Sequence, residues 1–75
     1  MNEENNLVTM ANQIGEFFET MPDRHQASED LAGHLKRFWE PRMRKSLLQY
    51  VNEQGGAGLK AIVLDALRSH QASIL

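Results

Sequence analysis

The segment that decides the fold reads Lys36-Arg37-Phe38-Trp39-Glu40-Pro41-Arg42-Met43-Arg44. Its proline lacks a backbone N–H and disfavours helical geometry in the residue before it, so we expect one helix to end near Trp39 and another to begin at Pro41. Together with the adjoining Lys45, the segment holds five of the eight Lys and Arg residues and the only Trp of the chain. It is therefore predicted to form a corner between two helices that presents an aromatic ring and several cationic side chains.

Apolar residues repeat with helical spacing on both sides of this corner and predict four short helices. These helices cover residues 7–21, 24–38, 41–53 and 59–70. The first is apolar over about half of its circumference, more than one neighbouring helix would cover. Pro22 separates it from the second helix, and Asp23 followed by Gln26 resembles an N-cap with its capping-box partner. The glycines in residues 55–58 predict a loop of left-handed conformation before the fourth helix.

Three positions in these helices carry further expectations. The apolar period places Phe38 on the inward face of the second helix. Arg44 falls in the middle of the apolar face of the third helix, and such violations of the pattern tend to mark functional sites. Glu40 lies four residues before Arg44, a spacing that favours an ion pair. Gly33, on the polar side of the second helix, either allows a close approach to the backbone or marks a tolerant surface position.

These elements predict an all-α fold, a small single-domain bundle of about four short helices with a proline-marked elbow between the second and third. The domain covers residues 1–75, with frayed ends at residues 1–6 and 71–75. Hydrophobic residues make up 41% and charged residues 24%, as is typical of folded soluble proteins. No stretch approaches the ~20 apolar residues that span a bilayer. The polar, acidic N-terminus does not resemble a secretory signal, so we expect a cytoplasmic protein.

The sequence contains no pattern typical of a catalytic or metal-binding site. Without Cys, the chain can form neither a disulfide nor a thiolate metal site. Its three histidines, His25, His34 and His70, are scattered and lack the spacing of a helical metal site. We therefore expect a chain that is not itself an enzyme.

The basic corner has three interpretations. It is a solvated charged face with Trp39 in the core, or a small helical DNA-binding domain that uses the segment from Lys36 to Lys45, or a docking site. A net charge of −2 speaks against DNA binding. In the docking interpretation, which we favour, Trp39, Arg42 and Arg44 reach an acidic and apolar surface of a larger subunit.

Four motifs are distinctive: Met10-Ala-Asn-Gln-Ile-Gly-Glu-Phe-Phe18, Met21-Pro-Asp23, Ala32-Gly-His-Leu-Lys-Arg-Phe-Trp-Glu-Pro-Arg-Met-Arg44 and Gly55-Gly-Ala-Gly-Leu59. Together they resemble the delta subunit of soluble NAD-dependent, molybdenum-containing formate dehydrogenases. The similarity covers roughly residues 7–63. It implies a non-catalytic accessory subunit of a hetero-oligomeric complex that docks on the large (alpha) subunit. There it would support assembly, stability or cofactor insertion, as a permanent subunit or as a transient chaperone.

The complex implied by this resemblance oxidises formate to carbon dioxide and reduces NAD. Its molybdenum bis-guanine dinucleotide, iron–sulfur clusters and FMN belong to other subunits, and a chain without Cys fits a subunit that binds no cofactor. The resemblance implies neither a nucleic acid nor a membrane as partner. The partner-binding residues that it suggests are Asn12, Gln13, His34, Trp39, Arg42 and Arg44.

Overall fold

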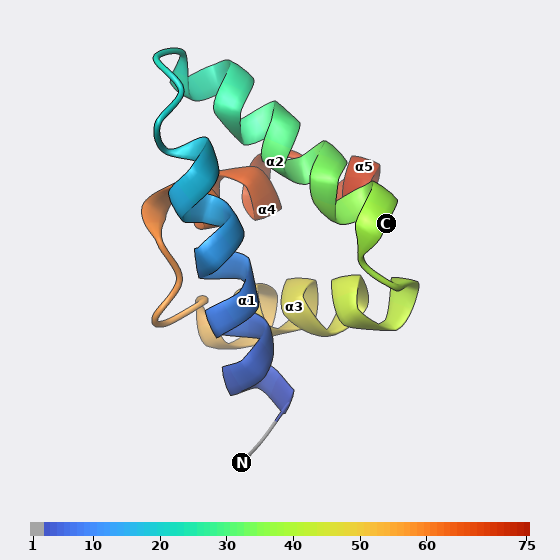
Figure 1. Ribbon diagram of the computed structural model, residues 1–75. Coiled ribbons are helices and arrows are strands. Elements are labelled where there is room, and N and C mark those ends of the chain that lie inside the picture. The colour runs from blue at the N-terminus through green and yellow to red at the C-terminus, as the bar shows by residue number, and fades with distance from the viewer. Residues whose placement is uncertain (1–2) are drawn as a thin grey trace.

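The computed structural model describes residues 3–75, and within them every regular element is an α-helix (Figure 1). The helices are α1 (Glu3–Phe18), α2 (Arg24–Phe38), α3 (Pro41–Gln54), α4 (Ala61–Ser69) and α5 (Gln71–Ile74). They pack around one core into a single globule. The predicted all-α class is confirmed, and a short fifth helix is added to the four expected.

Helix α4 packs against each of the four other helices, as α2 also does, and lies in the interior of the fold. Figure 1 shows it in the space between α1 and α2. Its residues Ile62, Val63 and Ala66 are fully buried. A nine-residue helix is too short to persist alone in water, so its neighbours supply its stability.

Local signals place most helix ends. Asp23 caps α2 by accepting a hydrogen bond from the backbone N–H of Gln26 at 3.2 Å, although the Gln26 side chain donates to Asp30 and completes no capping box. Helix α3 begins at Pro41 and ends at Gln54, and the next residue, Gly55, has a φ of 77° that is left-handed as predicted.

Helix α1 ends at Phe18, three residues before the predicted end. The Thr20 hydroxyl donates to the Phe17 carbonyl at 2.8 Å, and the backbone N–H groups of Thr20 and Met21 bond three residues back to Phe17 and Phe18. These shorter bonds tighten the chain into a turn and stop the helix.

The elbow reverses the expected positions of two aromatic residues. Phe38 is 71% exposed, whereas Trp39 is 6% exposed and belongs to the core. The reason is that α2 ends at Phe38, and the extended backbone of Trp39 (φ −89°, ψ 141°) turns its ring inward. The prediction of an inward Phe38 was wrong. Trp39 lies in the core, as in the solvated-face interpretation and not as in the favoured docking interpretation.

The ends of the chain differ from the expected frayed termini. Of residues 1–6, the first two lie outside the described residues, and residues 3–6 belong to α1. At the other end, α5 packs against α2 and α4 and fully buries Ile74. The C-terminal segment is therefore part of the core, because its one apolar anchor meets a surface that α2 and α4 leave open.

Candidate partner-binding surface

Arg44 stabilises the elbow by hydrogen bonds to its backbone. Its Nη1 donates hydrogen bonds to the carbonyl oxygens of Lys36 at 3.0 Å and of Trp39 at 2.7 Å, and the side chain is only 9% exposed. These carbonyls lie at the C-terminal end of α2, where peptide carbonyls lack intrahelical partners and the helix dipole favours a cation. Arg44 therefore pairs within the chain, with backbone oxygens and not with Glu40 as the spacing had suggested.

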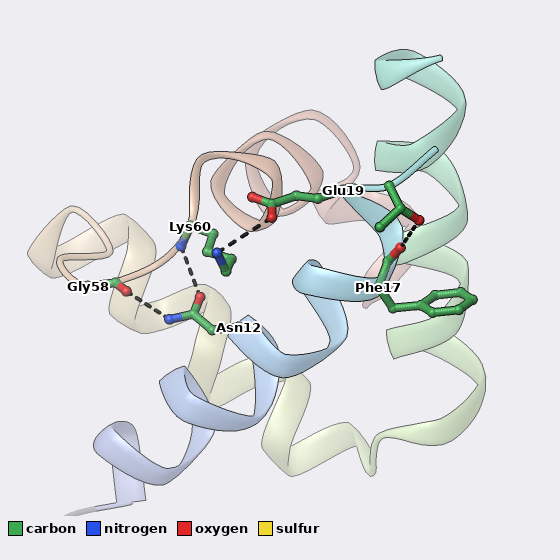
Figure 2. Close-up of polar contacts among 6 residues, drawn as sticks. Asn12, Phe17, Glu19, Gly58 and Lys60 are labelled. Atoms are coloured by element: carbon green, nitrogen blue, oxygen red, sulfur yellow. Dashed lines mark hydrogen bonds and ion pairs between the residues drawn. The ribbon is translucent and has the colours of Figure 1, made fainter. Parts of the chain in front are cut away.

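Asn12 connects α1 to the glycine loop (Figure 2). Its Nδ2 donates to the carbonyl of Gly58, and its Oδ1 accepts from the backbone N–H of Lys60, both at 2.9 Å. The ammonium of Lys60 also lies 3.5 Å from the carboxylate of Glu19. Asn12 thus fixes the entry to α4, which begins at Ala61 and not at the expected residue 59.

The six residues suggested for partner binding fall into two groups. Contacts inside the chain hold three of them: Asn12, Trp39 and Arg44. Three others keep accessible surface: Gln13 on α1, His34 on α2 and Arg42 on α3, of which His34 is half-buried. Contact with a partner stays a prediction for all six, and it needs the smallest rearrangement for the second group.

An aromatic strip with exposed ends crosses from α1 to α2 and consists of Phe17, Phe18, His34 and Phe38. Successive ring centroids lie 5.2, 5.9 and 4.8 Å apart. The two ends are the most exposed large apolar residues among those described, Phe17 at 70% and Phe38 at 71%. The Phe17 ring points outward from α1, away from Asn12 and the glycine loop (Figure 2). Single exposed apolar residues are common on proteins, but a connected row of rings is typical of a binding surface.

Sequence reasoning missed this strip because the helical period placed Phe38 on the inward face of the second helix, and Phe17 fell within the broad apolar face of the first. One feature of the sequence could have indicated the aromatic strip. Phe17-Phe18 and Phe38-Trp39 are adjacent aromatic pairs at helix ends, and neighbouring residues in a helix point about 100° apart. Trp39 lies in the core and Phe18 packs against it while partly buried, whereas Phe38 and Phe17 stay exposed.

The basic elbow borders the Phe38 end of the strip. We use this name for residues 36–45, in which five positive charges oppose the one negative charge of Glu40, a net of +4 in a chain of net charge −2. Four of its cations are exposed: Lys36, Arg37, Arg42 and Lys45. The remainder of the chain is correspondingly acidic, so the elbow is a distinct positive region.

Other kinds of site have no counterpart in the part of the chain that the structure describes. Residues 3–75 enclose no pocket, and their His, Asp and Glu side chains form no group of three or more that could hold a metal ion. In the same range, no helix has the length and apolar character required to cross a membrane.

Comparison with known protein families identifies the chain over most of its length. Searches among curated proteins and among solved structures found no match. Residues 6–67 match the family described as NADH-dependent formate dehydrogenase delta subunit, FdsD.

Proposed function

This chain belongs to the delta-subunit family of NADH-dependent formate dehydrogenases, and we propose that it is a non-catalytic accessory subunit that docks on the large, molybdenum-containing subunit of such an enzyme. In this role it supports the assembly, stability or cofactor insertion of the large subunit in the cytoplasm. The chain itself binds no cofactor, and molybdenum bis-guanine dinucleotide, iron–sulfur clusters, FMN and NAD are bound elsewhere in the complex.

The observation that carries this proposal is the aromatic strip. Phe17 and Phe38 each leave about seven tenths of their surface in water. Aromatic side chains are enriched at protein interfaces and supply much of their binding energy. A 75-residue domain without disulfides also has a small core of its own, and such domains commonly gain stability by association.

The test is to purify the enzyme from cells that produce all other subunits, with and without this chain. With the chain present, we expect it to copurify with the large subunit. Without it, we expect a lower yield of large subunit or less molybdenum per large subunit. Equal yield, equal molybdenum content and equal formate oxidation in both preparations would contradict the proposal.

The stoichiometry of the purified enzyme separates a permanent subunit from a transient chaperone. A permanent subunit stays in the active complex at one copy per large subunit. A chaperone is present on immature large subunit and absent from the fully metallated enzyme. Native mass spectrometry of both forms measures the difference directly.

DNA binding through residues 36–45 is the second candidate function, and the net charge of +4 in the basic elbow favours it. Binding driven by phosphate contacts weakens steeply as the salt concentration rises. A gel shift of random duplex at low salt that disappears at higher salt would support this alternative. The absence of any shift at low salt would exclude it.

A further inference from the structure

We propose that the aromatic strip and the basic elbow form one docking surface, and that its occupant is an apolar surface of a partner subunit bordered by carboxylates. This inference rests on the proposed function, which it deepens by specifying the chemistry that the large subunit must present. The inference has three parts: the rings of the strip contact one another, the cations beside it form no ion pair with any described residue, and space is left next to it.

The strip is held in place before any partner binds. Phe17 and Phe18 meet edge to face at an interplanar angle of 86°, and Phe18 meets His34 of α2 at 67°. The turn after α1 is fixed by the hydrogen bond from the Thr20 hydroxyl to the Phe17 carbonyl. A surface that is already ordered loses less conformational entropy on binding, so its buried area contributes more to affinity.

Among the residues that the structure describes, the cations of the basic elbow form no ion pair. Ion pairs among the described residues join Arg24 to Asp65, His25 to Glu29 and Lys60 to Glu19. None of these pairs uses a cation of residues 36–45. An uncompensated positive border selects a partner of opposite charge and increases the rate of encounter. This charge favours carboxylates around the apolar surface that covers the rings.

Arg37 belongs to the basic elbow and lies beside the aromatic strip on α2. On α2, Gly33 and Arg37 form one row of residues four apart, and His34 and Phe38 form the adjacent row. The guanidinium of Arg37 lies 3.7 Å from the position that a Cβ at Gly33 would take, and no other atom beyond the adjoining residues and the nearby backbone of α2 lies within 4 Å of that position. The absence of a side chain at Gly33 therefore leaves room beside the strip that internal packing does not use.

The experiment measures the Kd between the purified chain and the purified large subunit in complex with its other partners. The test variants are Phe17→Ser, Phe38→Ser, Arg37→Glu and Gly33→Gln. The matched controls are Leu75→Ser, an apolar residue that is 57% exposed at the other end of the chain, and Arg68→Glu, an exposed cation of α4. Far-UV circular dichroism and thermal unfolding verify that each variant is folded.

We expect each phenylalanine variant to raise Kd by about tenfold or more, as truncation of an interface anchor does. Arg37→Glu should raise Kd, slow association and reduce the dependence of association on salt, because it removes a steering charge. Gly33→Gln should raise Kd while the fold stays intact, since it fills the space beside the strip. Both controls should stay within about twofold of the wild type, as peripheral surface changes do.

The outcomes distinguish this inference from the function on which it rests. If the wild type binds and both phenylalanine variants bind as tightly, this docking surface is wrong and the accessory function stands. If the wild type does not bind the large subunit, the proposed function fails and the inference fails with it. If the phenylalanine variants disrupt only self-association of the chain, measured by sedimentation velocity, the occupant is a second copy and the inference is again overturned.

Discussion

At the residue scale, Arg44 illustrates how a charge on an apolar helix face can meet a structural requirement. The α2 helix ends at a corner that buries Trp39, and the carbonyls there need hydrogen-bond donors. A backbone carbonyl that is buried without a partner costs about 1–3 kcal/mol. The guanidinium of Arg44 reaches back from the next helix and supplies two hydrogen bonds from one nitrogen. A residue that breaks the apolar pattern here stabilises the elbow itself.

We predict that Arg44→Ala lowers the free energy of unfolding by about 2–4 kcal/mol, because it removes two charge-assisted hydrogen bonds and leaves the carbonyls of Lys36 and Trp39 without their donor. Arg42→Ala, two residues away and exposed, should change it by less than about 0.5 kcal/mol. Urea unfolding followed by circular dichroism gives both values. Equal stability of the two variants would show that Arg44 does not cap α2.

At the scale of elements, the central position of α4 requires its neighbours to approach closely. A Cβ at Gly15 of α1 would lie 2.8 Å from Cγ2 of Val63 and 3.4 Å from Cγ2 of Ile62, so the glycine sets the distance between α1 and α4. Val63 is fully buried and branched at Cβ, and it has little freedom to move aside. Gly33 of α2 has no such neighbour. Gly15 is therefore required for a close contact between helices, whereas no such contact requires a glycine at position 33.

Substitution of each glycine by alanine should change the free energy of unfolding in opposite directions. Gly33→Ala is expected to raise the free energy of unfolding by about 0.5–1 kcal/mol, since alanine favours the helix and its Cβ meets only the Arg37 guanidinium, at an ordinary contact distance of 3.7 Å. For Gly15→Ala, overpacking against Val63 costs about 1–3 kcal/mol and outweighs the gain in helix propensity. We therefore expect net destabilisation. Thermal unfolding measures both effects, and an increase in Tm for Gly15→Ala would disprove the close α1–α4 contact.

At the scale of the whole molecule, one core includes residues of every helix. It extends from Leu7 in α1 to Ile74 in α5, and Trp39 contributes to it from the elbow. Because α4 contacts all the other helices, no helix can leave without exposing part of this core. The charge on the molecule is unevenly distributed: the basic elbow has a net positive charge, and the remainder of the chain has a net negative charge.

A shared core predicts that the chain unfolds in one cooperative transition. Trp39 is the only Trp, and its burial makes its fluorescence a reporter of the elbow, while far-UV circular dichroism reports all helices. Urea titrations followed by the two signals should give the same midpoint within error. A lower midpoint for fluorescence would mean that the elbow opens before the helices unfold, which contradicts a single core.

The sequence by itself determined the helical class, the bounds of α2, the start of α3, the left-handed end of α3 and the membership of Arg44 in an apolar face. Each of these depends on neighbours within a few residues: a proline, an N-cap aspartate, glycines and a helical period. It also determined the family, through motifs that extend over most of the chain.

Only the tertiary structure decided which aromatic of each adjacent pair is buried, what Arg44 and Asn12 bind, and that Ile74 completes the core. Asn12 and Gly58 are 46 positions apart, and the burial of Ile74 depends on α2 and α4. Such contacts form between helices that are distant in sequence. The spacing of apolar residues within one helix carries no information about how these helices pack against one another. The exposure of Phe17 and Phe38 follows from the same physics, because each is adjacent in sequence to an aromatic residue that packs toward the core, and adjacent residues point in different directions.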